Sequence, residues 1–240
     1  MQKHGATGNS NLFDTASMIT QSTLSFLRGL KSTNTRAWFE EHRSEYQEAY
    51  GEVIGLTAEL LREVCAFDSE VAASGLDPKN CIMRIYRDVR FSKDKSPYKT
   101  NFFVFINRGG RRSPFGGYYV HIGPEGESFA GGGVYMPESE ALGCLRAEIS
   151  GHFTEWRSIL SAEAFRSEFS EGVLPSGLLK RQPKGYESSD PALEYLKYKG
   201  YYTQRFFGDA EVTTPEFAGK LAALFRSVQP MVDFLNRSLG

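Results

Sequence analysis

The sequence is poor in cysteine and histidine, and it lacks the long apolar runs of membrane proteins. Its 240 residues include 3 cysteines and 4 histidines. No stretch approaches the roughly 18 uninterrupted apolar residues that a spanning helix needs, and no apolar segment near the N-terminus precedes a cleavage signal. The cysteines (Cys65, Cys81 and Cys144) are odd in number and widely spaced, which is typical of thiols in a reducing compartment. We therefore expect a cytoplasmic protein with no membrane partner.

The usual motifs of metal and cofactor sites are also missing. No Cys or His spacing matches a structural zinc site, so we predict no metal and no cofactor. The glycines at 109–117 and 131–133 fit neither the dinucleotide fingerprint nor the Walker pattern, which require a strand, a loop and then a helix start. No G-x-S-x-G nucleophile elbow is present. A function must therefore be sought in the distribution of side chains along the chain.

What the sequence does contain is enough apolar surface for one folded domain. Hydrophobic residues make up 40% of the chain, with 18 Phe and 12 Tyr, which excludes low-complexity disorder for its bulk. Residues 1–22 are small and polar without sustained periodicity, and we expect them to form a disordered tail. No repeat or Pro/Ser-rich linker interrupts the rest, so residues 23–240 are predicted to be a single domain.

Hydrophobic periodicity predicts the order of the elements. A helical period over 34–66, with Asn34 as its N-cap, gives way to a period of two that predicts strands at about 81–91, 101–107, 117–123 and 127–135. Helices follow at about 137–149, 152–169 and 190–199, then a strand near 201–206 and a last helix at 215–239. This order favours an α+β fold, in which a mostly antiparallel sheet with a central meander at about 81–135 packs against N- and C-terminal helices.

Positive charge is concentrated in one segment of this nearly neutral chain. The formal net charge is -1, yet the segment from Lys79 to Arg112 holds ten Lys and Arg residues against Asp88 and Asp94. Such a concentration raises the local concentration of anionic ligands. If the cations were only a solvated surface, we would expect interleaved acidic partners in similar number.

Strict alternation in 81–91 predicts which side chains leave the core. Four residues would face the core: Met83, Ile85, Val89 and Phe91. Four would line the opposite face: Arg84, Tyr86, Asp88 and Arg90. Arg87 lands among the apolar residues, so it needs a carboxylate from a neighbouring helix or a bulge that turns it outward. The following loop, Ser92–Thr100, combines hydroxyls, ammonium groups and backbone donors that suit a phosphate.

We therefore predict an anion site for a phosphorylated small molecule or nucleotide. Its ligand-binding residues are Arg84, Arg87, Arg90, Lys93, Lys95, Tyr98 and Lys99. Asp88 and Asp94 would orient the cations, and the candidates to move a proton in a hydrolytic or transfer reaction are Asp88, Asp94 and His121. The sequence leaves open whether the protein is an enzyme, and it does not give the oligomeric state.

Two alternatives remain at this stage. The basic segment is also compatible with a nucleic-acid-binding module, whose affinity would fall steeply with salt. It is equally compatible with a non-enzymatic scaffold in which the Arg and Lys residues form a structural ion-pair network with acidic residues.

Several long motifs resemble one known family. They are R-I-Y-R-D-V-R-F-S-K-D-K-S-P-Y-K-T at 84–100, N-T-R-A-W-F-E at 34–40, G-Y-Y-V-H-I at 117–122, G-G-G-V-Y-M-P-E at 131–138, L-K-R-Q-P-K-G-Y at 179–186 and D-F-L-N-R near the C-terminus. With them the chain resembles the bacterial family of domain of unknown function 2461 over nearly everything after about Thr23. The resemblance implies one intact domain. It implies no activity, because the family has no established reaction or catalytic residues to carry over.

Overall fold

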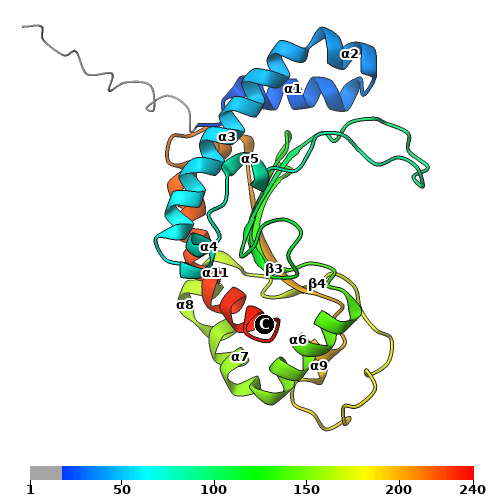
Figure 1. The fold of residues 1–240 in the computed structure, drawn as a ribbon, viewed down its shortest axis with the longest axis vertical. Coiled ribbons are helices and arrows are strands. Elements are labelled where there is room, and N and C mark those ends of the chain that lie inside the picture. Colours follow the sequence, from blue (N-terminus) through cyan, green and yellow to red (C-terminus); the bar gives the residue numbers. More distant parts are fainter. Residues whose placement is uncertain (1–17) are drawn as a thin grey trace, which may run out of the picture.

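A five-stranded antiparallel sheet, in the order β1-β2-β3-β5-β4, forms the centre of the fold. A computed structural model describes residues 18–240 (Figure 1). The strands are β1 (Phe102–Asn107), β2 (Gly117–Ile122), β3 (Ser128–Val134), β4 (Leu174–Pro175) and β5 (Tyr201–Phe207). The predicted α+β class is confirmed, as are the meander strands at 101–107, 117–123 and 127–135. The strand predicted near 201–206 is confirmed as β5, which pairs with β3.

Eleven helices accompany this sheet in the described residues. They are α1 (Gln21–Ser32), α2 (Arg36–Glu41), α3 (Arg43–Cys65), α4 (Ser69–Ala73), α5 (Pro78–Cys81), α6 (Ser139–Gly151), α7 (Phe153–Ser161), α8 (Glu163–Glu168), α9 (Leu193–Leu196), α10 (Asp209–Val212) and α11 (Phe217–Asn236). No helix within 18–240 is long and apolar enough to cross a membrane.

The N-terminal helices differ in detail from the sequence prediction. Most of the predicted tail, residues 1–17, lies outside the described residues. Helix α1 begins at Gln21, and Ile19 just before it is already buried. The helix predicted at 34–66 is split at His42 into α2 and α3. The predicted N-cap at Asn34 is wrong, because Thr35 caps α2 by accepting a hydrogen bond from the backbone N–H of Trp38.

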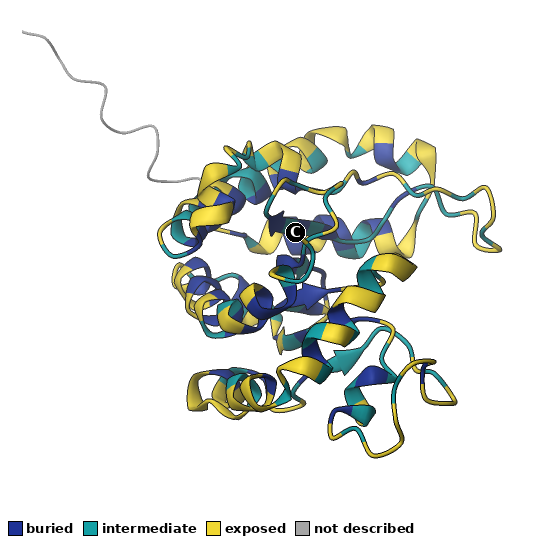
Figure 2. Cartoon of the chain, turned by 60° about the horizontal axis from the view of Figure 1, so that its bottom comes forward, coloured by how far each residue is buried: buried dark blue, intermediate teal, exposed yellow. Residues whose placement is uncertain are grey.

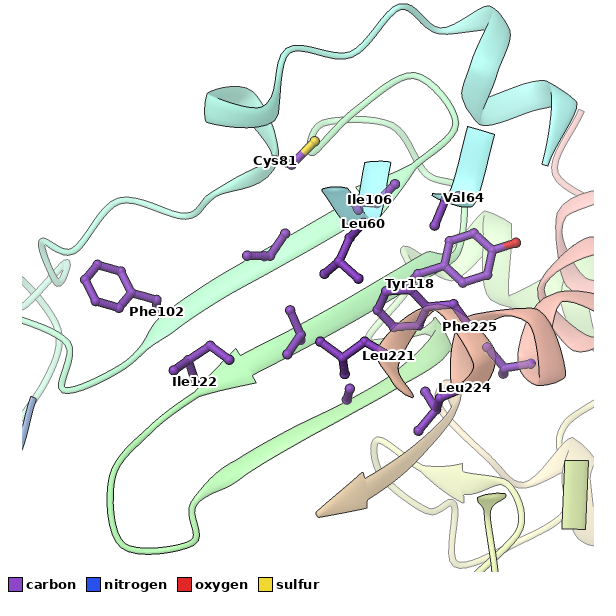
Figure 3. Close-up of a cluster of buried hydrophobic side chains, with 14 of the residues drawn as sticks. Leu60, Val64, Cys81, Phe102, Ile106, Tyr118, Ile122, Leu221, Leu224 and Phe225 are labelled. Carbon is purple, nitrogen blue, oxygen red and sulfur yellow. The ribbon is translucent and has the colours of Figure 1, made fainter. Parts of the chain in front are cut away.

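One face of the sheet is buried under α3 and α11. On β2 the side chains of Tyr118, Val120 and Ile122 lie on this face, and all three are fully buried. Helix α11 packs on β3, where Val228 lies so close to Gly132 that a side chain at that position would overlap it. Figure 3 shows Tyr118 and Phe225 side by side in this core, and in Figure 2 the sheet and the inner sides of the helices are dark blue. Each such apolar side chain contributes roughly 1.5–3 kcal/mol when fully buried.

The strand predicted at 81–91 is wrong. Residues 83–99, here called the arm, leave the edge of the sheet as an irregular hairpin, the teal segment that projects to the right in Figure 1. It pairs with itself through the backbone hydrogen bonds from Arg87 N–H to the Pro97 carbonyl and from Lys99 N–H to the Ile85 carbonyl. Because its outer part has no sheet beside it, alternation there does not separate core from surface. Phe91, predicted to face the core, is 96% exposed.

The base of the arm is fixed to the helices. Asn34 donates its side-chain amide to the Tyr98 carbonyl at 2.9 Å and accepts from the Tyr98 N–H at 3.1 Å. The Tyr98 ring stacks on Phe39 of α2, with centroids 4.0 Å apart. Tyr98, predicted as a ligand-binding residue, therefore anchors the arm through its buried ring.

Candidate functional site

The candidate site is the second face of the sheet, which is turned away from α3 and α11. Antiparallel register places three rows of residues across β1, β2, β3 and β5 on this open face. They are Asn107–Gly117–Gly133–Tyr202, Phe105–Tyr119–Gly131–Gln204 and Phe103–His121–Phe129–Phe206. The open face is therefore rich in aromatic rings, with Gln204 and His121 among them.

An aromatic cavity of about 710 Å³ occupies much of the open face. The rings that line it from the sheet are Phe103, Phe105, Tyr119, Phe129 and Tyr202. The loop 111–115 forms one wall, and residues 135–138 with the start of α6 form another. A concave, mostly apolar cavity with a few polar groups at its edge is the usual form of a small-molecule site.

Because Gly131 has no side chain, the Tyr119 ring can lie across the sheet. The Tyr119 hydroxyl donates a 2.7 Å hydrogen bond to the Thr203 carbonyl on β5, with β3 between them. A Cβ atom at Gly131 would overlap that same carbonyl oxygen. Burial raises the pKa of Tyr119 above its usual value, so its hydroxyl remains a neutral donor at physiological pH. This arrangement fixes one ring of the cavity floor.

His121 lies on the open face between two rings. It stacks on Phe129 with centroids 4.5 Å apart and contacts Phe103 edge to face. Burial lowers the pKa of His121 from its ordinary value, so the imidazole is neutral at pH 7. Among the described residues no group of three or more His, Cys, Asp and Glu side chains is placed to hold a metal ion.

A polar cleft of about 400 Å³ next to His121 collects half of the residues predicted from the sequence. Those it brings together are Arg87, Asp94, Tyr98, Lys99 and His121, and it adds Lys31 from α1 and Asn34 from the connection between α1 and α2.

Two arm arginines are already paired. Arg87 forms an ion pair with Asp94, so its predicted carboxylate partner comes from the arm itself rather than from a helix. Asp94 also accepts hydrogen bonds from the Ser96 hydroxyl and N–H, and these with Arg87 lower its pKa to about 2. Arg90 binds Asp88 through two contacts of 3.0 and 2.7 Å, which lower the pKa of Asp88. Both aspartates are therefore anions at neutral pH.

The outer half of the arm does not join the cleft. Asp88, Arg90, Lys93 and Lys95 do not line it. Lys95 donates to the Val89 carbonyl at 2.9 Å, which folds its ammonium group back onto the arm. These four predicted site residues are thus not brought together with the others.

Lys99, at the base of the arm, lies within range of the charges of two further cations, Arg84 and Arg111. Lys99 is half-buried, and its pKa is lowered first by burial and then by the positive charges of Arg84 and Arg111. Arg111 lines the aromatic cavity and donates to the Ile82 carbonyl at 2.7 Å, while Lys99 lines the polar cleft. Within residues 18–240 none of the three has a carboxylate at ion-pair distance. We call Arg84, Lys99 and Arg111 the cation trio.

Sequence reasoning missed Arg111 as a site residue and missed the whole aromatic floor. A signal was present, because β1 reads F-F-V-F-I-N and β2 reads G-Y-Y-V-H-I, so both faces of these strands are apolar. Such strands require either a second covering layer or a cavity on the open side.

The fold and site together define an α+β protein with helices α3 and α11 on one sheet face and, on the other, an aromatic cavity whose lining includes Arg111 and Arg112. The chain belongs to the family described as Conserved hypothetical protein (DUF2461), whose model matches residues 22–234. The resemblance noted in the sequence is thereby confirmed. Comparison with curated proteins and with solved structures gives no match.

Proposed function

We propose that the protein binds a phosphate-containing small molecule on the open face of its sheet, with the phosphate held by the cation trio. The observation that carries this proposal is that the positive charges of Arg84 and Arg111 both act on Lys99. Arg111 lines the cavity of about 710 Å³, Lys99 lines the polar cleft, and within 18–240 none of the three has a carboxylate at ion-pair distance. Two guanidinium groups supply paired donors that match phosphate oxygens, and the ammonium group supplies a compact charge.

The electrostatics of the trio favour an anionic ligand. The pKa of Lys99 is lowered mainly by partial burial and further by the like charges of Arg84 and Arg111. A phosphate dianion placed among them removes the repulsion and restores full protonation of Lys99. Binding is therefore expected to take up a proton at alkaline pH, where free Lys99 is partly neutral.

The three candidate proton carriers are not equivalent. Asp88 and Asp94 are held as anions by arm arginines, and Asp88 lies away from the polar cleft. Only His121 is both neutral at pH 7 and placed on the open face. If the bound phosphate is transferred or hydrolysed, His121 is the residue that we expect to move the proton.

The scaffold alternative has its own support on the arm. Arg87 with Asp94 and Arg90 with Asp88 are ion pairs made within one loop, and they favour a structural role for these two arginines. For the cation trio the same alternative is less well supported, because within 18–240 none of the three has a carboxylate at ion-pair distance, although the charge of Arg84 contributes to the lowered pKa of Asp88.

Isothermal titration calorimetry with inorganic phosphate, ribose 5-phosphate and AMP tests the proposal. We expect the double variant Arg84→Ala/Lys99→Ala to lose about tenfold or more in affinity, because hydrogen bonds to charged groups contribute about 1.5–3 kcal/mol. The matched control is Arg90→Ala/Lys93→Ala, which removes the same charge from the outer arm and should leave affinity unchanged. Equal affinities for both double variants would contradict the proposal.

Short oligonucleotides separate the nucleic-acid alternative. A log-log salt slope near -0.7 to -0.9 per phosphate contacted, with no binding of monophosphates, would favour a nucleic-acid module instead. We expect AMP to bind with a shallow salt dependence, since a single phosphate is engaged.

A further inference from the structure

We infer that the ligand carries a planar heteroaromatic ring, which the aromatic cavity stacks while the cation trio holds its phosphate. The ligand class is then that of nucleoside monophosphates rather than sugar phosphates or free phosphate. This inference rests on the proposed function for the phosphate, but its own evidence lies in the cavity.

The cavity floor presents ring faces and edges from several strands. Phe103 and Tyr119 lie nearly parallel with centroids 5.8 Å apart, and Phe129 meets Tyr119 edge to face at 6.2 Å. At the other end of the cavity Tyr135 meets Tyr202 edge to face at 5.3 Å. Offset and edge-on contacts of this kind are the preferred geometries of aromatic pairs. A planar ring bound in this cavity would make further contacts of the same kind. A sugar would instead place its hydroxyl groups against apolar surface, where they lose their hydrogen bonds to water.

One outer row of the open face has glycine on two strands. In the row that ends at Tyr202, β2 contributes Gly117 and β3 contributes Gly133. Gly133 has φ of 126°, a conformation open to glycine, and a Cβ atom there would overlap the Tyr201 carbonyl oxygen. Gly133 and Tyr202 both line the cavity, whose volume of about 710 Å³ falls in the range of roughly 300–1,000 Å³ seen for small-molecule sites.

The rim of the cavity carries two exposed apolar side chains on a strained backbone. Tyr135 is 62% and Met136 67% exposed, and both line the cavity. Met136 has φ of 51°, a left-handed conformation that is unusual for a residue with a side chain. Strain of this kind is concentrated at ligand sites. A flexible thioether and a ring at the rim can fold over a bound ring and exclude water from it.

Two polar side chains at the cavity can read the edge of a heterocycle. Gln204 lies in the central row of the open face, and its amide makes no hydrogen bond with the described residues. Glu138 lines the cavity just before α6 and is exposed. An amide offers one donor and one acceptor side by side, which matches the ring nitrogen and exocyclic amine of a base.

The test is calorimetric titration of the full chain with AMP, UMP, ribose 5-phosphate and adenosine. The wild type should bind at least one nucleotide about tenfold or more tightly than ribose 5-phosphate, since stacking on protein aromatics is worth about 1–3 kcal/mol per base. The variant Phe105→Leu/Tyr202→Leu should lose that preference and keep its affinity for ribose 5-phosphate. The control Phe206→Leu alters an aromatic residue of the same face that does not line the cavity, and it should behave as wild type.

The possible outcomes separate the ring inference from the phosphate proposal. If nucleotides and ribose 5-phosphate bind equally in the wild type, the ring inference is overturned while the phosphate proposal stands. If adenosine binds, is lost in Phe105→Leu/Tyr202→Leu and no phosphate improves affinity, the ring site stands and the phosphate proposal fails. If none of the four compounds binds, both fail. Circular dichroism melts confirm that each variant is folded.

Discussion

Phe102 and Phe103 are neighbours on β1, but they lie on opposite faces of the sheet and have different surroundings. Phe102 is 2% exposed and packs beneath the helices, whereas Phe103 is half-buried and lines the aromatic cavity. Tyr118 and Tyr119 on β2 likewise lie on opposite faces, although both are buried. The covered face uses its rings to hold α3 and α11 in place. The open face has rings of the same kind with no helix to hold, and these remain available to a ligand.

The largest difference is expected from the paired truncations Phe102→Ala and Phe103→Ala. Phe102→Ala leaves a cavity in the core and should lower the free energy of unfolding by about 3–5 kcal/mol. Phe103→Ala removes a half-exposed ring and should cost about 1 kcal/mol. Urea denaturation monitored by circular dichroism measures both. Equal losses would show that the open face is as important to stability as the covered face.

The hydroxyl groups of Tyr118 and Tyr119 allow a second comparison of the two faces. On the covered face Tyr118 donates to Asp68 at 2.8 Å, so Tyr118→Phe leaves a buried carboxylate oxygen without its partner and should cost about 1–3 kcal/mol. On the open face Tyr119→Phe removes one hydrogen bond to a carbonyl and should cost about 0.5–1.5 kcal/mol. The same denaturation experiment ranks the two losses of stability. A larger loss for Tyr119→Phe would contradict the assignment of Tyr118 to the covered face and Tyr119 to the open face.

Asp233 tests the electrostatics on the helix side. Partial burial and then the charge of Asp68 raise the pKa of Asp233 to about 6. The folded protein therefore binds a proton more tightly there than the unfolded chain does, so this group stabilises the fold at low pH and that contribution is lost as pH rises from about 4 to about 6.

Asp233→Asn should therefore raise the free energy of unfolding above pH 7, by on the order of 1 kcal/mol because solvent screens this position. The gain should be much smaller near pH 4, where the aspartate is protonated in the folded state and about half protonated in the unfolded state. Thermal melts at pH 4 and pH 8 measure the difference. A variant that is stabilised equally at both values would show that the carboxylate charge is not the cause.

The smallest effect is expected at the tip of the arm, which belongs to neither face. Phe91 is 96% exposed, so Phe91→Ser should change the free energy of unfolding by less than about 0.5 kcal/mol. A melting temperature within a degree of wild type is the expected result. A clear destabilisation would place the tip of the arm against the body of the protein.

The local pattern of apolar residues was sufficient to predict most strands of the sheet and the last helix. The alternating residues of β1 to β3 predicted strands, and the apolar spacing of α11 predicted a helix that buries Leu221, Phe225 and Val228. The arm has the same alternation as a strand. Whether an alternating segment joins a sheet or pairs with itself depends on the space beside the sheet edge, which local sequence does not encode.

The candidate site was predicted only in part for a similar reason. Charge concentration pointed to Arg84 and Lys99, and strand alternation pointed to His121. The folding of the loop after β1 brings the charge of Arg111 into range of Lys99, and the separation of the two residues in the sequence hid that proximity. The aromatic rings that line the cavity were not predicted as site residues. The sequence pattern shows that both faces of these strands are apolar, but it does not show which face the helices cover.

The central claim is that the open face is the binding face, and fluorine NMR tests it most directly. 4-Fluorophenylalanine placed at Phe105 reports on the aromatic cavity, and the same label at Phe102 reports on the covered face. Saturating AMP should shift the resonance at position 105 and leave that at position 102 in place. A stationary resonance at 105, or an equal shift at 102, would contradict the account.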